Sequence, residues 1–195
     1  MTSQYSDTMT LAEARSLFFA QSGLGEDGGY DARWVRVETK PFPVYFPNTT
    51  SRVEAAKLHD LHHIANEYAT DWAGEAEIAA WEIASGCGHH LWAWFLNLGA
   101  FTVGMFLFPK RLYGAFIRGR HCSNLYRDGF PESQLALKTV GSLRERLEID
   151  RDRPAANTRD NLAFTFWAFI ALGYHTAFGI AGLAIVWWIA ARLAS

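Results

Sequence analysis

The longest apolar run in the chain lies in its C-terminal part. From Leu162 to Ala191 about thirty residues carry no formal charge. A helix needs about 20 such residues to cross a bilayer, and Trp187 and Trp188 near the end of the run suit the membrane interface. The pattern predicts a helix over residues 162–192 that spans a membrane or is embedded in it.

A second uncharged run extends from Leu91 to Pro109 and is marginal in length for a membrane span. It is compatible with a short membrane segment, a buried helix, or a helix that holds a lipid chain. Lys110, Arg111, Arg118 and Arg120 follow it. These basic residues suit the headgroups of a cytoplasmic membrane surface, and solvated charges on an amphipathic helix explain them equally well.

Shorter patterns define the N-terminal part. Thr10 can cap a helix over residues 11–20, which glycines from Gly23 onward would end. Residues 33–46 alternate between polar and apolar types and contain Pro41 and Pro43. This alternation predicts two short extended segments or a small hairpin, with the prolines at an edge or turn.

Helix-forming segments occupy the middle of the chain. Helical periodicity, capping residues and terminal glycines predict helices over 52–68, 75–85 and 142–149. The fold class is therefore mainly α, a helical domain with a small extended N-terminal segment and a C-terminal transmembrane helix. We expect four regions: 1–50, with the first helix and extended segments; 51–150, a helical metal- and lipid-binding domain; 151–161, a charged linker; and 162–192, the membrane helix.

Three of the seven histidines lie close together on the helix expected over 52–68. At 100° per residue, His59, Asp60 and His63 fall within one arc of about 100°. His62 falls on the other side of His59 and is the spare histidine. A histidine pair at positions i and i+4 with a neighbouring carboxylate is typical of a helical site for a divalent metal.

A carboxylate on the next helix can complete this site. Glu75 follows His63 after eleven intervening residues and lies in the first turn of the helix expected over 75–85. Acidic residues favour that position for the helix dipole alone. Glu82, seven residues further on nearly the same face, is a further carboxylate that supports or completes the site. The candidate metal ligands are His59, Asp60, His63 and Glu75.

Composition and charge exclude some classes of function. Lys and Arg total 18 against 20 Asp and Glu, a balance that gives no electrostatic footprint for nucleic acid. Cys87 and Cys122 lack metal-ligand spacing and are expected to be small buried residues. The polar start of the chain does not resemble a secretory signal peptide. Arginines 151, 153 and 159 outnumber Arg192, which places the main domain on the cytoplasmic side.

The histidine segment also resembles a known family. His59-Asp60-Leu61-His62-His63 with Glu75 matches the hallmark of the coenzyme Q (ubiquinone) biosynthesis protein 4 family: His-Asp, two residues, His, eleven residues, Glu. Gly119-Arg120 and the segment 143–149 are similar to that family's closing motifs. The resemblance covers residues 51 to 150. The stretch 34–46 and the tail after Asp160 depart from the family, as in a divergent bacterial branch.

The resemblance implies a mainly helical fold, a lipid-binding cavity, and zinc or another divalent metal held by His59, Asp60, His63 and Glu75. It implies a role in ubiquinone biosynthesis, where the ring carboxylate of a polyprenylated hydroxybenzoate is removed and oxygen is installed at that carbon. The implied partners are a polyprenyl lipid or quinone precursor, the bacterial inner membrane and other ubiquinone-biosynthesis proteins.

Two other functions are compatible with parts of this pattern. A non-enzymatic, membrane-tethered scaffold would bind lipid and use its metal only to hold two helices together, and a closed four-ligand site would favour it. A phosphohydrolase of the His-Asp type needs an earlier histidine ligand. No histidine precedes His59, which counts against that class.

Overall fold

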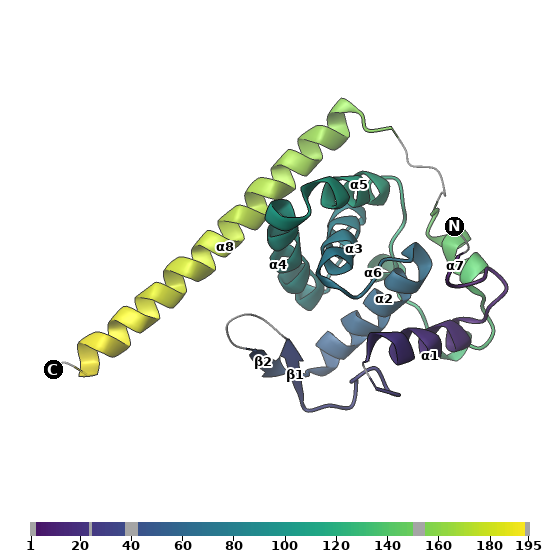
Figure 1. Cartoon of the computed structure of the whole chain (residues 1–195), viewed down its shortest axis with the longest axis horizontal. Coiled ribbons are helices and arrows are strands. Elements are labelled where there is room, and N and C mark those ends of the chain that lie inside the picture. Colours follow the sequence, from purple (N-terminus) through teal and green to yellow (C-terminus); the bar gives the residue numbers. More distant parts are fainter. Residues whose placement is uncertain (1–2, 24, 38–42, 150–154, 194–195) are drawn as a thin grey trace.

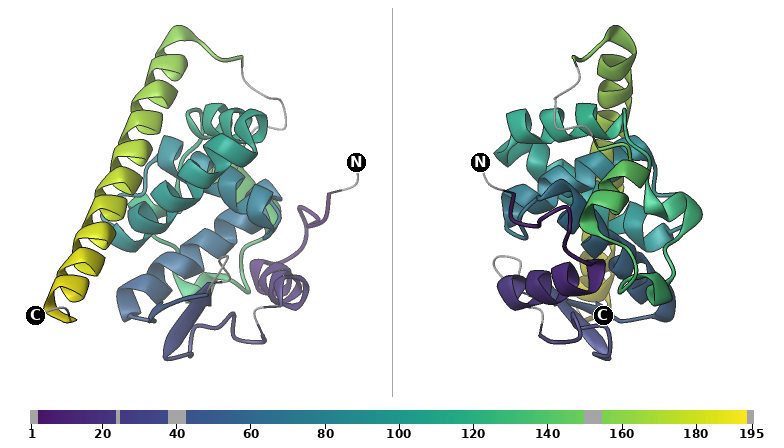
Figure 2. Two further views of the ribbon diagram at one scale, coloured as in Figure 1. Left: turned by 60° about the vertical axis from the view of Figure 1, so that its left-hand side comes forward. Right: turned by 90° about the vertical axis from the view of Figure 1, so that its right-hand side faces the viewer.

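The chain folds into a helical domain from which one long helix projects (Figures 1 and 2). The computed structural model describes residues 3–23, 25–37, 43–149 and 155–193. The elements are α1 Leu11–Ser22, β1 Trp34–Val37, β2 Val44–Pro47, α2 Thr50–Asn66, α3 Trp72–Ser85, α4 Leu91–Leu107, α5 Pro109–Gly119, α6 Leu125–Asp128, η1 Glu132–Gln134, α7 Val140–Arg146 and α8 Thr158–Leu193. The prediction of a mainly helical fold with a small extended segment is confirmed.

Helix α3 lies between α2 on one side and the pair α4 and α5 on the other (Figure 1). Trp81 of α3 is completely buried, and Ile78 and Ile83 are buried beside it. Helix α5 ends against the backbone of α3 at Gly119. A Cβ at this position would collide with the Trp81 carbonyl, so only glycine permits the close approach.

Strands β1 and β2 form the expected hairpin. They pair antiparallel, with Trp34 opposite Pro47 and Val37 opposite Val44. Pro43 directly precedes β2, and Pro41 lies outside the described residues. The hairpin is joined to α4 by Phe46, whose ring stacks on Trp92 at 5.6 Å between centroids.

Several element boundaries differ from the expected ones. Helix α3 begins at Trp72 because the Asp71 side chain accepts a hydrogen bond from the Gly74 N–H at 2.7 Å, whereas residues 69–74 looked like a turn. Asn157 caps α8 in the same way, so the last residues of the expected linker are helical from Thr158 onward. Cys87 is buried as expected, but Cys122 is only half-buried.

Helix α8 has two halves with different surroundings. Phe164 packs between Phe101 and Phe116, and Trp167 stacks on Trp94 at 5.0 Å. Beyond Phe178 the helix leaves the domain as an exposed arm (Figures 1 and 2). Among the described residues, α8 is the one helix long and apolar enough to cross a membrane, and it is a candidate span as the sequence predicted.

Candidate metal centre

The candidate centre lies where α2 meets the first turns of α3. The Thr49 side chain caps α2 by accepting from the Arg52 N–H, and α2 then runs for 17 residues until Glu67 adopts a left-handed conformation with φ of 58°. His59 and His63 are one helical turn apart on this helix, so their rings lie on the same face. Glu75, in the first turn of α3, approaches both.

Three ligand atoms converge at this junction. The Nε2 atoms of His59 and His63 lie 3.1 Å apart, and the Glu75 carboxylate oxygens lie 3.6 Å from the first and 3.4 Å from the second. Donor atoms that surround a zinc ion at about 2.0–2.1 Å in a tetrahedron lie about 3.3 Å from one another. His59, His63 and Glu75 therefore have the spacing to hold a small divalent cation.

The other ring nitrogen of each histidine has an acceptor as its partner. His59 Nδ1 lies 2.9 Å from Oε1 of Glu82, and His63 Nδ1 lies 3.0 Å from the Tyr68 carbonyl oxygen. A carboxylate and a carbonyl cannot donate, so each Nδ1 carries a proton, and Nε2 presents a lone pair when the ring is neutral. The two Nε2 atoms face each other and can share either one proton or one metal cation. Partners of this type also orient histidines in metal sites.

Glu82 accepts most of the hydrogen bonds on the buried side of this junction. Its side chain is fully buried, and its Oε1 also accepts a hydrogen bond from His62 Nδ1 at 2.7 Å. Its Oε2 accepts from the Asn97 amide and from the Tyr126 hydroxyl. Burial alone would raise the pKa of Glu82, but the charge of His59 and the hydrogen bonds from His59 and His62 outweigh burial and hold it well below its usual range.

His62 has a different role from its two neighbours. Its ring is fully buried, Nδ1 donates to Glu82, and Nε2 accepts the Leu125 N–H at 3.1 Å. Both nitrogens are therefore engaged, and burial lowers the pKa of His62 so that it stays neutral. The ring links α2 to α3 and α6, which fits its exclusion from the expected ligands.

Asp60 does not join the three converging residues. Its buried carboxylate accepts a hydrogen bond from the Tyr30 hydroxyl, and burial raises the pKa of Asp60. One residue step along α2 turns this side chain by 100° from His59. Of the four expected ligands, the structure thus brings together His59, His63 and Glu75, and it places Asp60 against the segment that precedes β1.

The electrostatics of the junction favour a cation at its centre. Burial opposes protonation of His59, but the carboxylates of Glu82 and Glu75 outweigh it and raise the pKa of His59 well above its ordinary value. Burial likewise works to raise the pKa of Glu75, and the two histidines reverse this and lower it. The Glu75 side chain is 39% exposed, so the centre is open to solvent on that side.

Sequence reasoning missed several groups that support this site, among them Tyr126, whose hydroxyl donates to Glu82. Asn97 donates to Glu82 and is one of two hydrogen-bonding side chains, with Thr102, in α4 apart from the tryptophans. That polar residue in an apolar run was an available signal. The Tyr68 carbonyl, by contrast, is a backbone atom, and no pattern of side chains predicts its position.

Comparison of the chain with known proteins identified no relative. No family model matches the chain, and neither a curated protein nor a solved structure matches it. Arguments about function therefore rest on the geometry and the chemistry of the residues themselves.

Proposed function

We propose that the chain is a metal-dependent protein of ubiquinone biosynthesis that acts on a polyprenylated hydroxybenzoate, at the ring carbon that bears the carboxylate. The observation that carries this proposal is the convergence of His59, His63 and Glu75, with the Nε2 atoms of both histidines directed inward. The spacing of these residues resembles that of the coenzyme Q biosynthesis protein 4 family.

The donor set suits a divalent metal with an open coordination position. Two imidazoles and one carboxylate are the protein ligands of catalytic zinc sites and also of non-haem iron sites that use oxygen. A metal bound here would supply a Lewis acid for a substrate carboxylate or phenolate. His59 and His63 would hold it through Nε2, and the half-exposed Glu75 would flank the side that faces solvent.

Glu82 and the Tyr68 carbonyl prepare the histidines for this role. Each accepts a hydrogen bond from Nδ1 of its histidine, so Nε2 faces the metal position and the ring needs no reorientation when a metal binds. The apolar helices α4 and α8 supply a non-polar surface on the same domain for a polyprenyl chain. A polar headgroup at the metal and a tail along these helices is the arrangement we propose.

A scaffold with a purely structural metal is less well supported. Glu82 already connects α2, α4 and the Tyr126 region through His59, His62, Asn97 and Tyr126 without any ion. Asp60, which would close a four-ligand shell, is hydrogen-bonded to Tyr30 instead. We therefore expect chelation to remove activity and to leave the helical fold in place.

Metal analysis and mass spectrometry of co-purified lipids test the proposal. We expect the purified full chain to contain zinc or iron and a polyprenylated phenol, and Glu75→Ala to lose both. Glu77→Ala is the matched control, because Glu77 lies on the same helix but pairs with Arg111 on the surface. Wild-type protein without metal and lipid, or equal metal content in Glu75→Ala and wild type, would refute the proposal.

Turnover of a polyprenylated hydroxybenzoate separates the enzyme from the scaffold. After chelation, an enzyme loses turnover while its circular dichroism spectrum is unchanged, and adding back one metal restores activity. A scaffold melts on chelation and shows no turnover before it.

A further inference from the structure

Large apolar side chains are exposed on one side of α4, at both ends of the helix. Five large side chains form this surface, which we name the outer face of α4: Leu91, Phe95, Leu96, Phe106 and Leu107. At 100° per residue they lie within an arc of about 160°. The other side of the helix carries the buried residues Ala93, Asn97, Phe101 and Gly104, and between the exposed ends Thr102 is buried against α8, where its hydroxyl donates to the Ala171 carbonyl. Exposed apolar surface of this kind marks a site of interaction.

The outer face is continuous with the candidate membrane span. The Phe95 ring lies 5.9 Å from that of Tyr174 and 5.7 Å from that of Phe178, and the Tyr174 hydroxyl donates to the Phe95 carbonyl at 3.2 Å. These are the residues at which α8 leaves the domain. The medium that surrounds α8 at Tyr174 and Phe178 therefore also contacts α4.

The length of the exposed arm determines what meets α4. From Phe178 to the next charged residue, Arg192, the helix rises about 21 Å, whereas the hydrocarbon core of a bilayer is about 30 Å thick. A spanning α8 must therefore include the residues down to about Tyr174. This requirement brings Phe95, at one end of the outer face, to the level of the lipid headgroups.

A basic cleft adjoins the far end of the outer face. Two residues after Leu107, α5 begins, and a cleft of about 370 Å³ between α3 and α5 is lined by Lys110, Arg111, Arg118, Tyr68 and Glu77, with two small residues. Arg111 pairs with Glu77 at 2.5 Å, and Arg118 lies over the Tyr68 ring. Three cations against one carboxylate leave the cleft positive, which suits an anionic headgroup.

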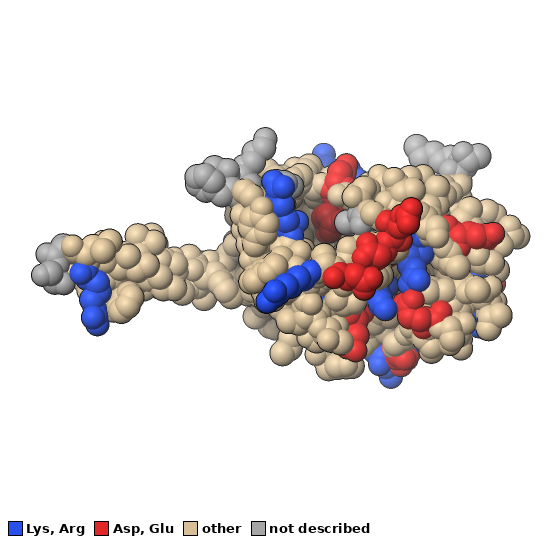
Figure 3. All heavy atoms as spheres, turned by 90° about the horizontal axis from the view of Figure 1, so that it is seen from below, with Lys and Arg blue, Asp and Glu red and all other residues tan. Residues whose placement is uncertain are grey.

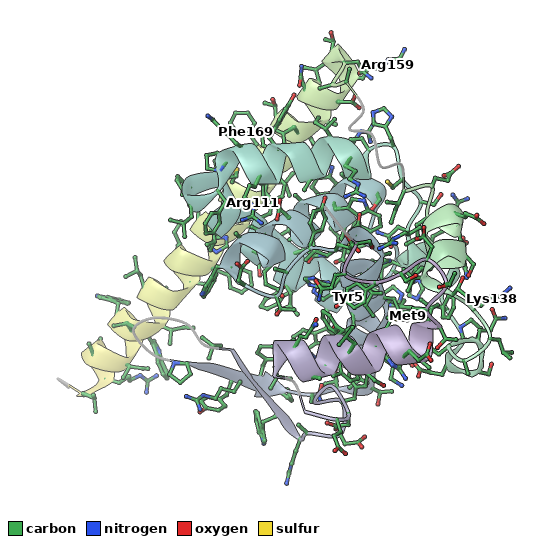
Figure 4. The ribbon with its side chains drawn as sticks, turned by 45° about the vertical axis from the view of Figure 1, so that its right-hand side comes forward. Tyr5, Met9, Arg111, Lys138, Arg159 and Phe169 are labelled. Atoms are coloured by element: carbon green, nitrogen blue, oxygen red, sulfur yellow. The ribbon has the colours of Figure 1, made fainter. Side chains whose placement is uncertain are left out.

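Figure 4 shows on which side of the domain the cleft residue Arg111 lies relative to α8. Arg111 and Phe169 of α8 lie on the same side, whereas Lys138 lies on the opposite one (Figure 4). The projecting arm is free of charge until Arg192 near its end, and acidic residues gather on the domain (Figure 3).

We propose that α4 lies in the plane of an anionic phospholipid bilayer, with its outer face among the acyl chains and the basic cleft on the lipid phosphates, while α8 crosses the membrane. An apolar helix face flanked by basic residues is the pattern of interfacial helices. This docking needs no metal, so it stands apart from the proposed enzymatic function.

Spin labels on the full chain test the docking. In a Cys122→Ser background, Leu96→Cys, Leu107→Cys and Leu137→Cys place one nitroxide each, and Leu137 is 78% exposed next to Lys138. The protein is reconstituted into phosphatidylcholine vesicles with or without phosphatidylglycerol. We expect labels at 96 and 107 to collide with oxygen more than with a water-soluble nickel complex, and the label at 137 to do the reverse.

A charge variant tests the cleft. We expect phosphatidylglycerol to deepen the label at position 107, and Lys110→Gln with Arg118→Gln to abolish this shift. Arg127→Gln with Lys138→Gln removes two cations elsewhere and should preserve it. The proposal is overturned if the protein does not float with vesicles, if 96 and 107 are as water-accessible as 137, or if both are shielded from both reagents, which would indicate a protein partner.

Discussion

The α2–α3 junction buries a charged group, whereas the outer face of α4 exposes apolar side chains to solvent. At the junction, the charged carboxylate of Glu82 is removed from water and accepts hydrogen bonds from four side chains. On the outer face, Phe106 and Leu107 are 71% and 62% exposed to solvent. Burying a charge is unfavourable unless it is fully paired, and exposing a large apolar face is unfavourable unless water is absent.

This difference separates two kinds of function. The junction is preorganised, because its histidines are oriented before any ligand arrives. The outer face is incomplete in water and needs a non-aqueous neighbour. Substitutions that act on one region and spare the other test the distinction.

The largest effect should come from Glu82→Ala. Removing this carboxylate leaves His59, His62 and Tyr126 without their buried acceptor, and breaking a buried charged pair costs about 3–5 kcal/mol. We expect the free energy of unfolding, measured by denaturant titration in detergent, to fall by that amount. Glu77→Ala removes a surface ion pair and should cost about 1 kcal/mol or less. Equal losses in the two variants would contradict a special role for Glu82.

Glu82→Gln preserves the shape of the side chain and removes its negative charge. Loss of a carboxylate that orients a metal-binding histidine lowers metal affinity by about 10- to 100-fold. Competition with a chromophoric chelator measures this change. If affinity is unchanged while Glu75→Ala abolishes binding, Glu82 does not act through His59.

Arg144 offers a test outside both regions. Its guanidinium donates to the carbonyls of Ala65 and Tyr5 and to Glu67, linking α7 to the end of α2 and the N-terminal segment. Arg144→Met should lower the free energy of unfolding by about 1–2 kcal/mol. It should spare both metal content and the docking of the outer face.

The same contact predicts a dependence on pH. Burial would raise the pKa of Glu67, but hydrogen bonds from Ser3 and Tyr5 and the charge of Arg144 outweigh it and lower this pKa. A lowered folded-state pKa stabilises the fold above the ordinary pKa, and the gain is lost as pH falls through the folded value. Wild type should therefore lose more stability on acidification than Arg144→Met. Parallel curves of unfolding free energy against pH would contradict this.

The smallest effect on stability should come from Leu107→Ser. Leu107 belongs to the outer face and is 62% exposed, so its substitution should change the free energy of unfolding by about 0.5 kcal/mol or less. The same change should reduce immersion of a spin label at position 96 in vesicles. A large loss of stability in detergent would mean that the outer face packs against protein.

Local patterns in the sequence predicted much of the fold. Thr10 caps α1 and Thr49 caps α2, and Gly86 ends α3, because capping depends on residues adjacent in the chain. The start of α3 was missed because Asp71, a capping residue, is followed by Trp72 and lies in a segment that resembles a turn. The long apolar run of α8 was evident from composition alone.

The candidate site was predictable only in part. Spacing on one helix placed His59 and His63 together, and Glu75 followed from the next helix. Asp60 also fell on the predicted face, yet the structure turns it toward Tyr30. Spacing along a helix gives the direction of a side chain but does not identify which distant residue meets it.

The sequence by itself determined where the longer helices form, which of them are apolar, and which side chains are of the types that bind a metal. Tertiary structure alone decided that Glu82 serves three elements, that the Tyr68 carbonyl orients His63, and that α4 turns an apolar face outward. The physical reason is that periodicity and capping are local, whereas hydrogen bonds between residues as distant as His62 and Leu125 depend on how the helices pack.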